Sequence, residues 1–265
     1  MGIGYKIELG VENVYFSKYN VLKETGKQRE FIMKLNLLYE DEYMLACVKP
    51  CGVPSQGDKS NDKDMITLLK EYLFDKSDSD EEPYLAVIHR LDRPVGGVMV
   101  FAKTPEAAAR LSDDMQEGCI VKYYQAILTG ELPDECGELT DYLVRDGKTN
   151  TAKIAKKGDK GAKKAILGYE VLDVMETDDG VLSYVLIELL TGRHHQIRAQ
   201  MAARGCGIWG DTKYNPRFAK TKRRYMQIGL YSSRIELDHP VTGEHMVFKH
   251  EPEGEAFEVI ELDEF

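Results

Sequence analysis

Between two short apolar segments, residues 85–88 and 98–102, stands the sequence His89-Arg90-Leu91-Asp92-Arg93-Pro94-Val95-Gly96-Gly97. We expect both apolar segments to be strands. Charged side chains and a glycine pair at a strand end suit a site better than a core, because glycine lets another backbone or a ligand approach closely. Arg90 and Arg93 flank Asp92, and we expect them to keep its carboxylate ionised. Such a carboxylate can act as nucleophile or general base, and the alternative is a salt-bridged turn without chemistry.

Strands and helices are interspersed around this stretch. Apolar patterns predict further strands at 37–39, 44–48, 120–128, 171–174 and 181–190, and helices at 65–74, 105–117 and 194–203. The short connections favour a largely antiparallel sheet flanked by helices, which is the α+β class. No linker divides the chain, so we expect one domain over 37–265 that follows an N-terminal extension, 1–36.

Composition limits the class of protein. The chain has 265 residues, 43% hydrophobic and 30% charged, which is typical of a soluble globular protein. Its most apolar run, 181–190, is far shorter than the roughly 20 residues that span a bilayer, and the first thirty residues hold no signal-peptide core. We therefore expect a cytoplasmic protein with no membrane partner. Five scattered cysteines predict neither a disulfide framework nor a zinc site.

The charge is unevenly distributed, although the net charge is −10. Residues 193–234 hold ten Lys or Arg against one acid, and residues 145–164 hold eight against two. By contrast, 235–265 holds ten acids and one lysine. Phosphate binding depends on the local field within a Debye length of about 8–10 Å, so an acidic protein can carry a basic RNA track. The alternative is that these runs are solvated faces.

A second polar segment, Thr191-Gly192-Arg193-His194-His195-Gln196-Ile197-Arg198, leads from a strand into a helix. Thr191 is the expected cap, and free amides at a helix start favour anions. Adjacent histidines on a helix point about 100° apart, unlike the i, i+4 pairs that share a metal, so we expect no metal here. The many donors of this segment suit an outside anion or the Asp92 carboxylate. The alternative for some of them is hydrogen bonding that holds loops together.

Residues 89–104, HRLDRPVGGVMVFAKT, and 191–198, TGRHHQIR, resemble the two signature motifs of the RluA-like pseudouridine synthases. The resemblance extends over residues 37–250. Shorter matches follow in the family order, at Tyr39-Glu40-Asp41, Lys49-Pro50-Cys51-Gly52, Lys122-Tyr123-Tyr124, Gly210-Asp211 with Tyr214, and His239-Pro240-Val241-Thr242-Gly243.

The resemblance implies an enzyme that isomerises uridine in ribosomal or transfer RNA to pseudouridine, without metal or organic cofactor. Asp92 falls on the catalytic aspartate, which would attack the ribose anomeric carbon or carbon 6 of uracil. Arg198 falls on its basic partner and Tyr124 on the aromatic residue that stacks on the target base. Arg90 falls on the arginine that enters the space left by the flipped uridine. The full set of candidate RNA-binding residues is Arg90, Arg193, His195, Gln196, Lys222, Arg223 and Arg224.

The sequence departs from the family pattern in places. Val95-Gly96-Gly97 stands where Thr-Ser-Gly is usual, His194 stands where Thr or Ser is common, and Ala199-Gln200 replaces Val-His. With 36 residues before the first matched strand, we expect no separate RNA-binding module of the kind that many members carry. We therefore expect a monomer without a protein partner, whose own basic segments select the RNA.

Two other functions fit parts of the pattern. One is an RNA-binding or ribosome-associated protein with this fold and no activity, although such a protein has no need of a carboxylate facing phosphates. The other is a glycosidase with Asp92 as nucleophile, which needs a second acid about 5–10 Å away. Asp211 is the only candidate for that acid.

Overall fold

The computed structural model describes residues 17–18, 35–57, 60, 62–177, 180–222 and 227–259. Within them one sheet runs in the order β1-β2-β3-β5-β11-β6-β10-β9-β7-β8, with β12 added to β11 and β4 to β5. The strands are β1 Ser17–Lys18, β2 Asn36–Glu40, β3 Met44–Lys49, β4 Ala86–Val87, β5 Gly96–Ala102, β6 Val121–Thr129, β7 Cys136–Asp146, β8 Thr151–Ala155, β9 Lys163–Thr177, β10 Gly180–Glu188, β11 Leu230–Asp238 and β12 His245–Lys249.

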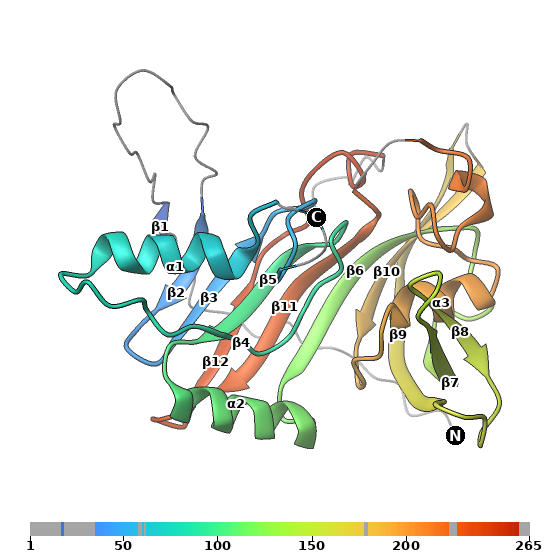
Figure 1. Cartoon of the computed structure of the whole chain (residues 1–265). Helices are drawn as coiled ribbons and strands as arrows, with labels where there is room; N and C mark the ends of the chain where they lie inside the picture. The colour runs from blue at the N-terminus through green and yellow to red at the C-terminus, as the bar shows by residue number, and fades with distance from the viewer. Residues whose placement is uncertain are drawn as a thin grey trace.

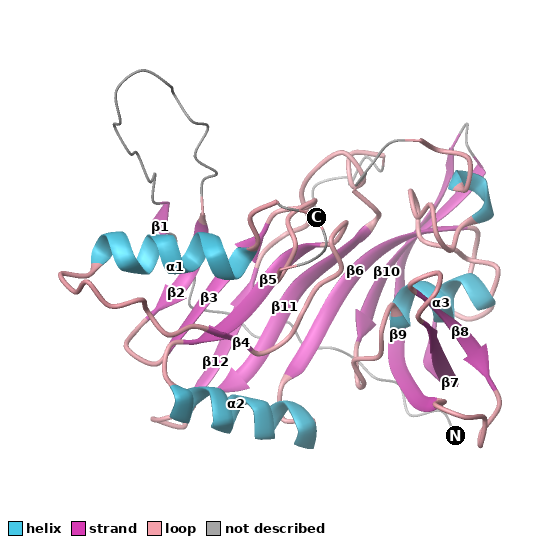
Figure 2. Ribbon diagram, in the orientation of Figure 1, coloured by secondary structure: helices cyan, strands magenta, loops and turns pink. Residues whose placement is uncertain are grey.

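Helices cover both faces of this sheet (Figures 1 and 2). They are α1 Met65–Lys76, α2 Pro105–Glu117 and α3 Gln196–Ala203. Alternate residues of a strand point to opposite faces. On β3, accordingly, Leu45 and Cys47 join the core that α1 and α3 cover, whereas Met44 and Ala46 join the core under α2. Figure 1 shows α1 near one end of the sheet and α3 near the other. The expected α+β class with a mostly antiparallel sheet is confirmed.

The strand that follows Asp92 makes the sheet mixed. β5 pairs with β3 in antiparallel fashion, but Gly96 and Gly97 pair with Tyr231 and Ser232 of β11 in parallel. Gly97 has φ +119°, and a Cβ atom there would lie 2.3 Å from the Ser232 carbonyl oxygen. The glycine pair therefore admits a second backbone, as its position at a strand end predicts.

Helix starts agree with the sequence in two cases and differ in the third. Asp64 accepts a hydrogen bond from the Thr67 amide at 2.7 Å at the start of α1, and Thr104 caps α2. The helix predicted over 194–203 is present as α3, but its predicted start at His194 and its predicted cap, Thr191, are wrong. α3 starts at Gln196, because His195 has a left-handed backbone with φ +50° and no side-chain capping bond.

The strands that the sequence did not predict are largely polar or exposed. β7 and β8 form a charged hairpin, and β9 runs for 15 residues where only 171–174 was expected. β11 was not predicted either, because the buried polar residues Ser232 and Ser233 interrupt its apolar pattern. Among the described residues, no helix is long and apolar enough to span a membrane.

Candidate active site

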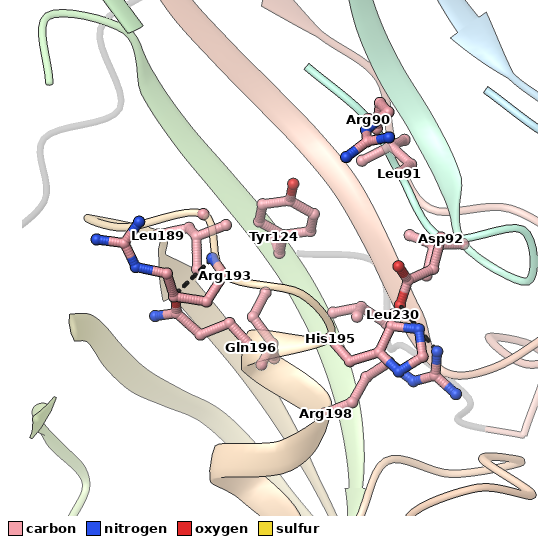
Figure 3. Close-up of a pocket in the computed structure, with 13 residues that line it drawn as sticks. Arg90, Leu91, Asp92, Tyr124, Leu189, Arg193, His195, Gln196, Arg198 and Leu230 are labelled. Atoms are coloured by element: carbon pink, nitrogen blue, oxygen red, sulfur yellow. Dashed lines mark hydrogen bonds and ion pairs between the residues drawn. The ribbon is translucent and has the colours of Figure 1, made fainter. Parts of the chain in front are cut away.

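A pocket of about 100 Å³ opens on the face of the sheet that α1 and α3 share. Three segments far apart in the sequence meet there: the loop with Arg90 and Asp92, Tyr124 on β6, and the turn before α3 (Figure 3). The two motifs singled out in the sequence thus form one site.

Asp92 lies in this pocket with its side chain 26% exposed. Arg198 Nη1 donates to its Oδ2 at 2.8 Å. Burial alone would raise the pKa of Asp92, but the Arg198 guanidinium outweighs burial and holds that pKa below its usual range. Asp92 is therefore an ionised carboxylate that solvent, or a ligand in the pocket, can reach.

The cation beside Asp92 comes from α3 rather than from the flanking arginines. The expectation that Arg90 and Arg93 keep Asp92 ionised is wrong in this respect. Arg93 donates to the carbonyl of Gly52 and forms an ion pair with Asp62. Arg90 is exposed at the pocket wall.

A second carboxylate fixes the orientation of Arg198. Asp211 is fully buried and receives Nε at 2.7 Å and Nη2 at 2.8 Å, a bidentate arrangement that fits the planar guanidinium. The centroid of the Tyr214 ring lies 5.1 Å from the guanidinium carbon of Arg198. Asp211 therefore leaves Nη1 as the part of Arg198 that faces Asp92.

Side chains of residues 49–55 hold the loop that carries Asp92 through hydrogen bonds to its backbone. Ser55 Oγ accepts from the Leu91 amide at 3.0 Å and donates to the Leu91 carbonyl at 2.8 Å. Lys49 is fully buried and donates to the carbonyls of Val53 and Arg93 at 2.7 and 3.3 Å. Burial lowers the pKa of Lys49 to about 7. These bonds hold the residues on both sides of Asp92.

Tyr124 forms the middle of the pocket wall. Its side chain projects from β6 on the face that also carries Lys122 and Ala126, all three buried, as the strand pattern predicts. In Figure 3 its ring lies between Arg193 on one side and Asp92 on the other. Burial, and next Asp92, raise the pKa of Tyr124, so its phenol is neutral.

The turn before α3 uses part of its donors for its own structure. Gln196 is 3% exposed, and its Oε1 accepts from Thr191 Oγ1 and from the Arg193 amide at 2.8 and 3.0 Å. Its Nε2 donates to the Ile166 carbonyl at 3.0 Å. The Gln196 amide therefore holds the turn together, which is the alternative stated above for some of these donors.

The two histidines do not diverge as helical neighbours would. They precede the helix, and their rings stack with centroids 3.8 Å apart. His195 is 8% exposed, with Nδ1 at 2.8 Å from the Tyr214 hydroxyl and Nε2 at 3.6 Å from Asp92 Oδ2. Burial lowers its pKa to about 3, so the ring is neutral and Arg198 is the cation that faces Asp92.

The other candidate residues have separate locations. Arg193 is exposed at the pocket, where its Nε donates to the Lys164 carbonyl at 2.8 Å. Lys222 is exposed after the short 3-10 helix Pro216–Phe218. Arg223 and Arg224 lie outside the described residues. His89 accepts from the Val100 amide at 3.2 Å, and burial lowers its pKa to about 3, so it supports β5 as a neutral ring.

Residues 43–203 match the family model described as RNA pseudouridylate synthase. The chain belongs to the RNA pseudouridylate synthase family. The matched range contains Asp92, Tyr124 and Arg198, and the resemblance to the RluA-like synthases is confirmed.

Relatives within this synthase family act on different RNAs, according to their names. The chain is 30% identical over 235 residues to ribosomal large subunit pseudouridine synthase D of Pseudomonas aeruginosa, covering 81% of this chain and 67% of that one. It is 31% identical over 235 residues to tRNA pseudouridine synthase C of Vibrio parahaemolyticus, covering 82% and 90%. The structure of human RNA pseudouridylate synthase domain containing 1 has the same fold, with TM-score 0.68 and 22% identity over 85% of this chain and 86% of that one.

The site also decides against the glycosidase alternative. That reading needs Asp211 as a second acid with access to substrate. Asp211 is fully buried and bound by Arg198, so it orients the arginine instead. Sequence reasoning did not assign positioning roles to Lys49, Ser55 and Tyr214. For Lys49 and Tyr214 the family-like segments that contain them were the available signal, whereas nothing around Ser55 distinguishes it from an ordinary loop serine.

Proposed function

We propose that this protein isomerises specific uridines in ribosomal or transfer RNA to pseudouridine, with Asp92 as the nucleophile. The observation that carries the proposal is the Asp92 carboxylate, which is ionised, accessible in the pocket and held by Arg198 at 2.8 Å opposite Tyr124. Membership in the synthase family supports it. The family names of relatives include both ribosomal and transfer RNA, so both remain candidate substrates.

The reaction needs one carboxylate oxygen and no redox step. Asp92 attacks the ribose anomeric carbon, with the electron pair of the glycosidic bond passing to uracil N1. Alternatively, it adds to carbon 6 of the ring, the π electrons of the C5–C6 bond move toward the carbonyl at carbon 4, and the glycosidic bond then breaks. The base rotates, a bond forms between carbon 5 and the anomeric carbon, and the link to Asp92 breaks. The proton of carbon 5 leaves to solvent, and N1 takes up a proton. Reactant and product are isomers, so no cofactor is required by the balance.

A uridine must leave its stack before Asp92 can reach it. Unstacking costs a few kcal/mol, and stacking on an aromatic ring recovers about 1–3 kcal/mol. We assign that stacking to Tyr124. We assign the exposed Arg90 to the space left by the base and the exposed Arg193 to the adjacent phosphates, since both line the pocket.

A basic surface next to the pocket suits the rest of the RNA. Its members are the exposed cations Arg145, Lys148, Lys153, Lys156, Lys157, Lys160, Lys163 and Lys164 on the β7–β8 hairpin and the start of β9. The bond from Arg193 to the Lys164 carbonyl joins this surface to the pocket rim. We propose that the RNA backbone runs along it, and that Lys222, Arg223 and Arg224 extend the track.

We also propose that the enzyme is monomeric and cytoplasmic and that its catalytic domain is 37–265. We propose that it uses no metal or organic cofactor. Transcripts of transfer RNA and large-subunit ribosomal RNA that contain 5-tritiated uridine test the activity, because isomerisation releases the label to water. We expect release in stoichiometric amount at one or few sites per transcript. Binding of the transcripts without any release would favour the RNA-binding protein without activity.

A further inference from the structure

Among the residues around Asp92, His195 has a geometry that RNA binding does not explain. Helix N-caps usually have extended backbone and an oxygen-bearing side chain that bonds to the helix. His195 instead has φ +50° and makes no capping bond. This conformation turns its ring away from α3 and toward Asp92, as Figure 3 shows.

The hydrogen bonds of Tyr214 decide which ring nitrogen of His195 carries the proton. The Ala152 amide donates to the Tyr214 oxygen at 2.6 Å, and that oxygen lies 2.8 Å from His195 Nδ1. Within the described part of the chain these are the two hydrogen-bond partners of the Tyr214 hydroxyl. The phenol proton therefore has an acceptor only if Nδ1 is unprotonated. The neutral ring then carries its proton on Nε2, which faces Asp92.

Two donors consequently approach the same oxygen of the carboxylate. Arg198 Nη1 lies 2.8 Å from Asp92 Oδ2, and His195 Nε2 lies 3.6 Å from it. The longer distance exceeds a hydrogen bond, but such bonds in active sites often tighten only when substrate is bound. For the side chain of Asp92, the hydrogen bond and ion pairs within the described ranges all go to Oδ2. Oδ1 remains for the substrate.

We propose that His195, held as the Nε2–H tautomer by Tyr214, is a positioning residue that orients Asp92 so that Oδ1 is the attacking oxygen. The stacked ring of His194, 3.8 Å away, fixes the ring plane. This inference rests on the proposed function, because it concerns the same nucleophile. It changes the assignment of His195 from RNA contact to support of the carboxylate.

Two substitutions at His195 separate its two ring nitrogens. His195→Gln places an amide nitrogen near the position of Nε2 and so keeps a donor toward Asp92. His195→Asn places its amide near Nδ1, so it keeps the contact with Tyr214 and loses the donor. We expect His195→Asn to lower kcat about 10- to 100-fold with KM within about 3-fold, as for a misplaced reacting group, and His195→Gln to stay within about 5-fold of the parent.

Steady-state rates of tritium release on 5-tritiated transcripts measure these effects, with His245→Asn as control, since His245 is 61% exposed on the β11–β12 hairpin. Equal losses in the two His195 variants, or a change confined to KM, would overturn the inference. Thermal unfolding shows whether either variant fails to fold. If neither variant folds, the His195 tautomer measured on the parent protein decides whether the inference holds.

Nitrogen NMR of ¹⁵N-histidine-labelled parent protein measures the tautomer without substrate. We expect the proton of His195 on Nε2, and we expect Tyr214→Phe to lose this preference. A proton on Nδ1 in the parent would overturn the inference. Absence of tritium release by the parent on every transcript would instead contradict the proposed function, whereas the NMR result decides the tautomer independently.

Discussion

Replacing Arg198 with methionine removes the one cation that bridges Asp92 and Asp211. The arginine is 4% exposed and donates at 2.7 and 2.8 Å to Asp211 and at 2.8 Å to Asp92. Loss of one partner from a buried ion pair costs about 3–5 kcal/mol, because the remaining charge is left uncompensated. We therefore expect Arg198→Met to lower the free energy of unfolding at pH 7 by about 3–5 kcal/mol.

The pH dependence of this variant has a definite sign. In the parent, the pKa of Asp92 in the folded state lies below its usual range. Ionisation of Asp92 therefore stabilises the fold at any pH above its pKa in the unfolded chain, about 3.9. This contribution is lost as the pH falls through the pKa of the folded state. Without Arg198, burial is left to raise the pKa of Asp92 above its usual value. The folded variant then binds more protons than the unfolded chain, so its stability deficit grows from pH 5 to pH 7.

Urea unfolding at pH 5 and pH 7, together with tritium release over the same range, measures both effects. We expect the release rate of the variant to fall as pH decreases, because Asp92 becomes protonated, whereas Asp92 ionisation leaves the parent rate unchanged there. Arg204→Met is the matched control, since Arg204 pairs with Asp141 at 2.6 Å but is 25% exposed. It should cost about 1 kcal/mol or less and leave the release rate unchanged. An Arg198→Met protein within 1 kcal/mol of the control, with the parent pH profile, would show that Arg198 does not compensate the charges of Asp92 and Asp211.

Three further predictions concern the sheet, the pocket and the RNA track. Gly97→Ala should lower the free energy of unfolding by at least about 2 kcal/mol in urea titrations, because its Cβ would lie 2.3 Å from the Ser232 carbonyl oxygen, whereas Gly147→Ala, with open space around it, should have little effect. Tyr124→Leu should weaken transcript binding by about 1–3 kcal/mol in filter-binding assays through lost stacking, and unchanged affinity would remove Tyr124 from the base-binding role. Replacing Lys156, Lys157 and Lys160 with Glu, or Lys222, Arg223 and Arg224 with Glu, should make the slope of log affinity against log salt concentration about 2 units less steep. An unchanged slope would place the replaced residues outside the RNA track.

The sequence was sufficient for the parts of the fold that depend on local pattern. The Thr104 cap with Pro105, and the Gly118 end of α2, are local signals and appear as expected. Tyr124 shares its strand face with Ala126 because a strand alternates. Partners distant in sequence required the motif resemblance: Asp92 and Arg198 are 106 residues apart, and no periodicity connects them.

Other features depend on tertiary contacts that no local pattern encodes. His194 and His195 directly precede a helical sequence and were predicted to belong to the helix. The left-handed backbone at His195 instead makes the helix begin at Gln196. The buried Ser232 lies on β11, where the parallel contact with Gly97 makes a small polar residue suitable although it hides the strand pattern. Likewise, the alternatives for the donors of 191–198 could not be separated until Gln196 was found buried with its amide bonded to the chain.

Comparison of the parent with Asp92→Asn on 5-tritiated transcripts, with RNA affinity measured in parallel, tests the assignment of the nucleophile most directly. The amide keeps the size of the side chain but lacks the ionised oxygen that attacks. We predict that tritium release by the variant is abolished while its affinity for the same transcripts stays within about 3-fold of the parent, since Asp92 contributes attack rather than binding. Normal release by Asp92→Asn would contradict the account.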